Sequence, residues 1–331
     1  MLNLGIVTIV VVVLALSFDF INGFHDTANA IATSVSTRVL SPSEAILMSA
    51  VLNFVGALIS TKVAKTVGGH IVDGSQVAQT VVLSALLAAI IWNLITWYFG
   101  IPSSSSHAII GGLIGAAIVY KGTFSIVQWG NLMSEVVLWL FLSPVIGFIM
   151  GYIIMVILNW ILRKTKPKTV TRVFSKAQIV SAALMAFNHG GNDAQKSMGI
   201  ISMALVSAGA ISTFHVPTWV KISCAVSMAL GTSIGGWKII KTMGVNMAKL
   251  APVNGFAAET GAAAVIFTAT MLKAPVSTTH IISGSIMGVG ASKRLTSVNW
   301  ALAKNIMSTW LLTIPICAIV AGVSMAIIKL F

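Results

Sequence analysis

Two short stretches of the sequence combine proline, hydroxyl side chains and histidine between strongly apolar runs. "PSSSSHAIIGG" begins at Pro102 and "PVSTTHIISGS" begins at Pro275. The pattern P-x-S-[ST]-[ST]-H therefore occurs twice without a gap, once in each half of the chain. Because proline fits the first turn of a helix, each stretch predicts a helix start at membrane depth.

The hydroxyls at these two starts have the chemistry of an anion site. The first turn of a helix offers free N–H groups and the positive end of the helix dipole, and hydroxyls add further donors. We predict that the two stretches face each other around a tetrahedral oxyanion. The predicted ligands are Ser104, Ser105, Ser106, Ser277, Thr278 and Thr279. The alternative is that each stretch is a serine-rich helix cap without a ligand.

A histidine follows each set of hydroxyls. His107 and His280 either donate to the anion or bond a neighbouring carbonyl, and the sequence leaves both alternatives open. A serine hydrolase is disfavoured, because adjacent helix residues such as Ser106 and His107 point about 100° apart. The recurrence of the stretch also argues against a hydrolase, which needs only one intact catalytic pair. We therefore predict that it is not an enzyme.

A second repeated motif carries an acid in each copy. "NGFHDTANAIA" starts at Asn22 and "HGGNDAQKSMG" starts at His189, and the two align with Asp26 on Asp193. An acid within the membrane costs about 2.5–3.5 kcal/mol and marks a functional site by default. Oxygen ligands without sulfur suit a hard cation. The predicted cation ligands are Asn22, Asp26, Asn29, Asn192 and Asp193. The alternative is a buried aspartate that caps a helix.

The five other acids divide into two groups. Asp19 and Glu259 fall at membrane depth and are therefore functional candidates. Glu44 follows "SPS", as at an ordinary helix start, Asp73 lies in the turn-like "VDGS", and Glu135 opens an apolar run. We expect these last three to be solvated structural residues.

The composition is that of an integral membrane protein. Of the 331 residues 57% are hydrophobic and 8% are charged, and the mean hydropathy is +0.97. Soluble domains carry about 25% charged residues. The net charge of +13 does not indicate nucleic-acid binding, because the basic residues lie between apolar runs, where cytoplasmic loops collect Lys and Arg. The expected surroundings are a lipid bilayer.

The two motifs and a third match reveal a duplication. "KVAKTVG" from Lys62 matches "KIIKTMG" from Lys238, and the three matches keep nearly the same spacing along the chain. We predict a first repeat with a connecting helix over 1–160, a basic cytoplasmic linker broken by Pro167 over 161–176, and a second repeat over 177–331. Gly-containing segments at the Asp motifs and short segments after the prolines indicate interrupted and re-entrant helices. The predicted fold is an all-α polytopic membrane protein with about 10–12 membrane segments and, preferably, inverted repeats.

The quoted motifs, "GFHDTANAIA" with "GGNDAQKSMG" and "PSSSSH" with "PVSTTH", resemble those of the inorganic phosphate transporter family over nearly the whole chain. The resemblance implies cation-coupled phosphate uptake through an inverted-repeat membrane fold. It assigns the coupling cations to Asp26, Asn29 and Asp193. It assigns phosphate to the hydroxyl motifs. A membrane glutamate of the family falls on Glu259, a candidate coupling residue, and the sequence leaves open whether this acid binds a further cation, carries a proton or pairs with a lysine such as Lys241. The residues that match the family's hydroxyl motif are Ser105, Ser106, Thr278 and Thr279.

Three residues depart from the family pattern. His25 stands where asparagine is expected, and Gln195 and Lys196 stand where a small residue and asparagine are expected. The ammonium of Lys196 either competes with a cation for the carboxylate or supplies positive charge toward phosphate. Both alternatives stay open at this stage.

The charge of a bound phosphate has to be balanced by co-bound cations, helix ends or Lys196. Phosphate carries about one to two negative charges near neutral pH, and neither hydroxyl stretch contains an arginine. The density of Asn, Ser and Thr around Asp26 favours a sodium cage. Together with the family resemblance, these residues predict a secondary active transporter of the cell membrane that imports inorganic phosphate with sodium as co-substrate and without a cofactor. The alternatives are proton-coupled phosphate or metal–phosphate symport and a passive anion channel. A homo-oligomer is left open.

Overall fold

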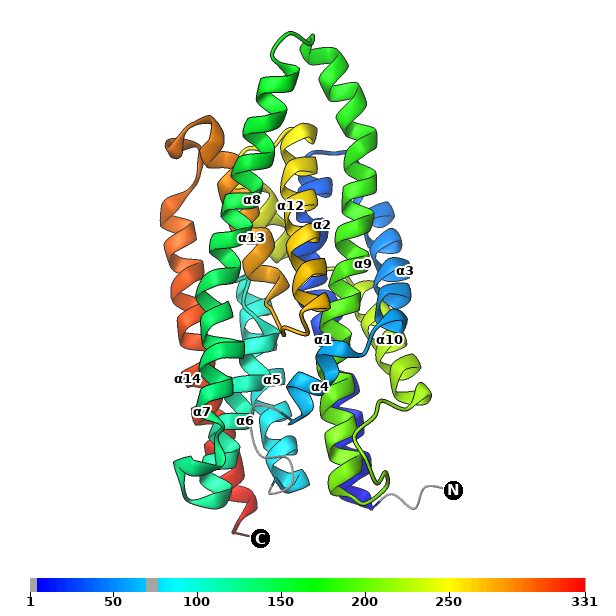
Figure 1. The fold of residues 1–331 in the computed structure, drawn as a ribbon, viewed down its shortest axis with the longest axis vertical. Helices are drawn as coiled ribbons and strands as arrows, with labels where there is room; N and C mark the ends of the chain where they lie inside the picture. Colours follow the sequence, from blue (N-terminus) through cyan, green and yellow to red (C-terminus); the bar gives the residue numbers. More distant parts are fainter. Residues whose placement is uncertain (1–4, 70–76, 331) are drawn as a thin grey trace.

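The computed structural model describes residues 5–69 and 77–330 (Figure 1). Asp73 lies outside the described residues, as does the side chain of Glu135. The helices are α1 (Ile6–His25), α2 (Thr27–Ser36), α3 (Pro42–Ile59), α4 (Lys62–Gly69), α5 (Gln79–Phe99), α6 (Ser105–Lys121), α7 (Trp129–Asn131), α8 (Leu138–Leu162), α9 (Pro167–Ser207), α10 (Thr218–Thr232), α11 (Trp237–Lys241), α12 (Pro252–Met271), α13 (Thr278–Lys293) and α14 (Trp300–Ile328). Short 3-10 or π turns cover Phe124–Ile126, Leu132–Val137, Thr242–Asn246 and Leu295–Ser297.

This helical architecture confirms the predicted all-α membrane fold. The β pairing in the described ranges is a single bridge between Ala248 and Val298. Five stretches of helix there are long and apolar enough to cross a bilayer: Ile6–Ser36, Pro42–Ile59, Gln79–Phe99, Trp129–Leu162 and Trp300–Ile328. Large apolar side chains such as Leu311 and Ile319 are exposed on the outer surface, as lipid contact requires. The count of 10–12 segments and the inverted relation of the repeats stay predictions.

Two helical hairpins provide the hydroxyl stretches. The first hairpin is α5 with α6 and the second is α12 with α13. Figure 1 shows them entering from opposite ends of the molecule, with their tips near its middle. The tips touch, because Ser106 Oγ donates to the carbonyl of Val276 at 3.3 Å. The prediction that proline opens the first turn was wrong, since α6 begins at Ser105 and α13 at Thr278. In both copies a serine is the N-cap residue instead.

The hairpins pack against long helices through glycine. Gly147 and Gly151 of α8 lie against the backbone of α13, and Gly284 and Gly288 of α13 lie against the backbone of α8. Gly111 and Gly115 of α6 lie in the same way against α14. Small residues four apart let two membrane helices approach closely. The second hairpin therefore packs on α8 from the first half of the chain, and the first hairpin packs on α14 from the second half, so the two halves interlock.

The two Asp motifs differ in backbone structure. The first motif is interrupted as predicted, because α1 ends at His25 and α2 begins at Thr27, with Asp26 between them. The expected interruption of the second motif was wrong, because α9 runs through Asp193 as one helix of 41 residues. In α9, Gly190 lies against the backbone of Asn53 in α3, so its glycine permits a close helix contact instead of a break.

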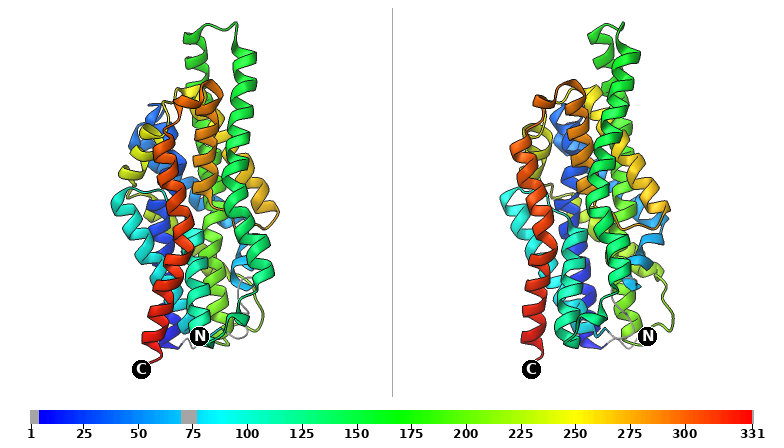
Figure 2. Two further views of the ribbon diagram at one scale, coloured as in Figure 1. Left: turned by 90° about the vertical axis from the view of Figure 1, so that its left-hand side faces the viewer. Right: turned by 60° about the vertical axis from the view of Figure 1, so that its left-hand side comes forward.

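The basic segment also differs from its prediction. Pro167 is the first residue of α9 rather than a helix breaker, because proline is compatible with the first turn. Residues 163–166 alone join α8 to α9, and the ends of these two helices project beyond the other helices (Figure 2). The basic side chains there are exposed, namely Arg163, Lys164, Lys166, Lys168, Arg172 and Lys176. The division into repeats and linker stays a prediction.

Candidate functional site

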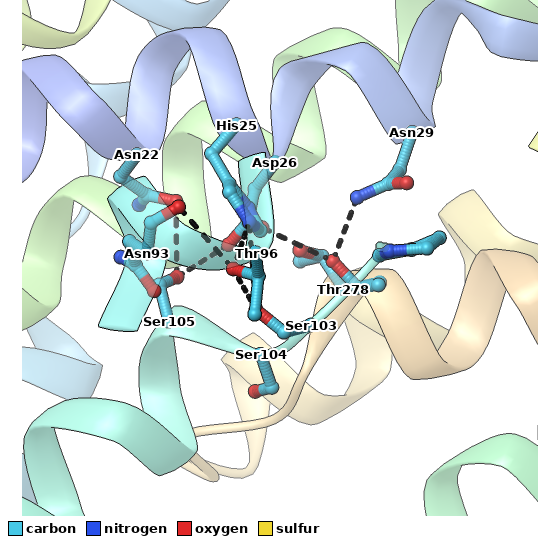
Figure 3. Close-up of polar contacts among 12 residues, drawn as sticks. Asn22, His25, Asp26, Asn29, Asn93, Thr96, Ser103, Ser104, Ser105 and Thr278 are labelled. Carbon is cyan, nitrogen blue, oxygen red and sulfur yellow. Dashed lines mark hydrogen bonds and ion pairs between the residues drawn. The ribbon is translucent and has the colours of Figure 1, made fainter. Parts of the chain in front are cut away.

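Both hairpin tips converge on the two motif aspartates. Ser105, at the start of α6, donates a hydrogen bond to Asp26 Oδ2. Thr278, at the start of α13, donates to Asp193 Oδ2 at 3.4 Å. All four side chains are buried at the centre of the bundle. Two elements that are far apart in the sequence thus build one polar site (Figure 3).

The two halves also cross over within this site. Thr279 of the second hairpin donates to Asp26 Oδ1 of the first motif at 3.3 Å. Asn22 of the first motif donates in turn to Asp193 Oδ2 of the second motif at 3.5 Å. Neither half could form this arrangement alone, so the site depends on both copies of the duplication.

Hydroxyls, amides and one histidine surround Asp26. Besides Ser105 and Thr279, His25 Nδ1 lies 2.7 Å from Asp26 Oδ1. Asn22 Oδ1 accepts from Ser105 at 3.0 Å, and Asn29 Nδ2 donates to Thr279 Oγ1 at 2.9 Å. The predicted cation ligands Asn22 and Asn29 therefore surround the same carboxylate.

Asp193 has a charged neighbour. Lys196 Nζ lies 2.8 Å from Asp193 Oδ1, and both side chains are buried. His189 Nε2 lies 3.7 Å from the other carboxylate oxygen. The remaining predicted ligand, Asn192, points elsewhere and donates to Thr270 Oγ1 at 2.8 Å.

The remaining hydroxyls of the two stretches have structural contacts. Ser104 Oγ accepts from the backbone N–H of His107 at 3.3 Å, and Ser277 Oγ accepts from that of His280 at 3.2 Å. These are N-cap hydrogen bonds. Ser106 links the two tips through Val276. The hydroxyls that face the carboxylates are thus those of Ser105, Thr278 and Thr279, and phosphate binding by any of the six stays a prediction.

Several site residues were missed in the sequence. His25 Nε2 lies 2.9 Å from Thr96 Oγ1, which in turn lies 2.9 Å from Ser103 Oγ, so a polar chain supports the histidine beside Asp26 (Figure 3). Neither side-chain polar atom of the buried Asn93 makes a hydrogen bond within the described ranges. The position of His25 directly before Asp26 was a usable signal, whereas Thr96 and Asn93 lie in an apolar helix and only the tertiary fold brings them here.

Glu259 belongs to a separate buried cluster. Thr33 Oγ1 and Ser181 Oγ each donate to its carboxylate at 2.5 Å, and Gln178 Nε2 donates at 3.1 Å. These donors come from α2 and α9, whereas Glu259 is in α12. Its partners are neutral, and the sequence had not singled out any of them.

The two histidines of the hydroxyl stretches stack. The ring centroids of His107 and His280 are 4.9 Å apart, and His280 also stacks on Trp310 at 3.8 Å. Trp310 Nε1 donates to the carbonyl of Pro102 at 3.0 Å. These rings therefore support the hairpin tips by packing. Asp19 is also buried, with Ser197 and Cys224 as polar neighbours.

Comparison with known proteins identifies the family. A model of the phosphate transporter family matches residues 22–321. The chain belongs to the phosphate transporter family. This family member is therefore a membrane transporter and not an enzyme, as its motifs predicted.

The relatives of this family member agree with that assignment. It is 52% identical to a probable low-affinity inorganic phosphate transporter of Bacillus subtilis (strain 168), over 98% of each chain. It is 48% identical to a protein of the same description from Rhizobium meliloti (strain 1021), over 94% of this chain and 93% of the relative. A solved structure described as the sodium-dependent phosphate transporter matches with a TM-score of 0.88 at 25% identity, over 99% of this chain and 100% of the other.

Proposed function

We propose that this phosphate transporter imports inorganic phosphate by symport with sodium, with phosphate bound between the first turns of α6 and α13. The convergence of both hairpin tips on Asp26 and Asp193 supports the proposal most strongly. The hairpins enter from opposite ends of the molecule (Figure 1), as two inverted repeats would. Alternating access then exposes one central site to each side in turn.

Charge explains why phosphate and cation bind together. The hydroxyls of Ser105, Thr278 and Thr279 donate to carboxylates in this structure, and the same donors can turn to phosphate oxygens. A phosphate placed beside the buried carboxylate of Asp26 would be repelled by it. A cation between the phosphate and this carboxylate removes the repulsion, so each solute raises the affinity for the other. Coupled transport follows when only the fully loaded or the empty site changes its access.

The oxygen chemistry around Asp26 favours sodium. A carboxylate, two hydroxyls and the amide oxygens of Asn22 and Asn29 are hard ligands without sulfur. Asn29 Oδ1 makes no hydrogen bond within the described part of the chain, so it is available to a cation. The similarity to a transporter described as sodium-dependent points the same way.

One observation favours a proton-coupled alternative. Each motif carboxylate already lies against a nitrogen, His25 Nδ1 at 2.7 Å from Asp26 and Lys196 Nζ at 2.8 Å from Asp193. Basic partners of this kind occupy the oxygens that sodium would use.

Transport into proteoliposomes tests the proposal. The purified protein is reconstituted, and uptake of ³²P-labelled phosphate is followed under an inward sodium gradient at equal pH on both sides. A second sample receives an inward proton gradient without sodium. We expect accumulation in the first sample only. Accumulation in the second sample at the same rate would show that protons, not sodium, are the coupling ion. Accumulation in neither sample would refute symport.

We also propose that the protein lies in the cell membrane with residues 161–176 on the cytoplasmic side. The exposed basic cluster at the α8–α9 turn supports this orientation. The variant Ser175→Cys should react with a membrane-impermeant maleimide in inside-out vesicles but not in intact cells. Both native cysteines are buried, which keeps the background labelling low. Labelling in intact cells would show that residues 161–176 lie on the outer side of the membrane.

A further inference from the structure

The internal duplication pairs two residues of different charge. In the alignment that places Asp26 on Asp193, Asn29 falls on Lys196. Both side chains reach the central site, Asn29 through Thr279 and Lys196 through Asp193. The second copy therefore carries an ammonium where the first copy carries a neutral amide.

Lys196 differs from the other basic residues in its burial. Of the Lys and Arg residues that the structure describes, only Lys196 is buried, with 1% of its surface exposed. A buried ammonium requires a partner, and its partner is the Asp193 carboxylate 2.8 Å away. The two residues are three apart on the unbroken helix α9, so the backbone holds them together.

The two motif carboxylates consequently differ in their need for a cation. The donors to Asp26 from Ser105 and Thr279 are uncharged hydroxyls, and its third neighbour is the imidazole of His25, a group that, unlike an ammonium, can also donate a hydrogen bond as a neutral ring. The charge of Asp193 is compensated by Lys196. A monovalent cation at Asp193 would have to displace an ammonium that cannot leave the protein.

We infer that the ammonium of Lys196 serves as a built-in cation for the second half of the site. The site then combines one fixed positive charge with exchangeable cations at Asp26, and each phosphate is carried with one cation fewer than it would be with asparagine at position 196. This inference rests on the proposed symport and deepens it, because it concerns the number of cations per phosphate. Lys196 sets that number by its charge and its position beside Asp193.

The ratio of the two fluxes tests this role. Lys196→Asn restores the residue of the first copy, and uptake of ²²Na⁺ and ³²P-labelled phosphate is measured in the same proteoliposomes. We expect the sodium-to-phosphate ratio to rise by one relative to the unmodified protein. Lys196→Arg keeps the fixed charge and should keep the original ratio. An unchanged ratio in Lys196→Asn would overturn the inference.

A charge-neutral double variant serves as the matched control. Asp193→Asn with Lys196→Asn removes both charges, so the original ratio should return whatever the rate. If Lys196→Asn does not transport, equilibrium binding of ³²P-labelled phosphate to the purified variant is measured against sodium concentration, and its Hill coefficient should exceed that of the unmodified protein. Loss of phosphate binding at saturating sodium would show that the ammonium holds phosphate itself, which also overturns the inference. Absence of any coupled uptake by the unmodified protein would instead refute the proposed symport, so the two failures are distinguishable.

Discussion

Asp26 and Asp193 occupy equivalent places in the duplication but differ in their surroundings. Asp26 lies at a helix break among hydroxyls, amides and one histidine. Asp193 lies inside a continuous helix, where Lys196 faces it at 2.8 Å. One duplicated motif thus provides both an open carboxylate and a compensated one. The comparison teaches that repeated acids need not have repeated roles, because a single change three residues away alters the charge balance.

The largest expected effect concerns the stability of the second copy. Asp193→Asn leaves the Lys196 ammonium buried without its partner, and breaking a buried ion pair costs about 3–5 kcal/mol. The thermal unfolding midpoint of the purified protein in detergent should fall clearly. The double variant with Lys196→Asn should recover most of the loss. Equal unfolding midpoints for Asp193→Asn and Asp26→Asn would contradict the proposal that only Asp193 compensates a buried charge.

A slightly smaller effect in free energy is expected for transport through the first copy. Asp26→Asn removes the charge that attracts the exchangeable cation, and interactions with a charged group contribute about 1.5–3 kcal/mol each. Sodium-driven phosphate uptake should drop by about 100-fold, while the folded protein remains in the membrane. Membrane fractionation checks that the variant is in the membrane, and an uptake assay measures its transport. Normal uptake would show that Asp26 has no coupling role.

Removal of the hydroxyls that face the carboxylates should have a moderate effect on the KM for phosphate. Ser105→Ala combined with Thr278→Ala removes one donor from each hairpin tip, so the KM for phosphate should rise about 10-fold or more. Initial rates over a range of phosphate concentrations give this value. An unaltered KM would exclude the tips from phosphate binding.

The smallest effect is expected at the cap serines. Ser104→Ala and Ser277→Ala each remove an N-cap hydrogen bond and should cost about 1 kcal/mol of stability. We expect them to raise the KM for phosphate less than Ser105→Ala does. A larger rise in KM at Ser104 than at Ser105 would assign the anion to the cap positions.

The repeated motifs contained most of the information about the site. The hydroxyl stretches and the aspartates predicted which elements meet, because polar groups repeated at membrane depth must find one another or a ligand. The helix break at Asp26 was also predicted correctly. The continuity of α9 was not, because Gly190 and Gly191 indicate either a break or a close helix contact, and only the position of α3 decides between them.

Other site residues depended on the tertiary fold. Thr96 and Asn93 lie in the apolar helix α5, where no local pattern distinguishes them. The donors to Glu259 come from two helices that are far from it in the sequence, so their meeting required the packing of α2, α9 and α12. The sequence could not decide whether Ser104 and Ser277 cap a helix or bind an anion, because both roles use the same residue type at a helix start.

The most direct test is a crystal structure of the purified protein with arsenate, which has nearly the shape and charge of phosphate and can be located by its anomalous scattering. We predict one arsenic peak between the first turns of α6 and α13, within hydrogen-bonding reach of the Ser105 and Thr278 hydroxyls. A peak remote from both hairpin tips, with these hydroxyls still bonded to Asp26 and Asp193, would contradict the proposed site.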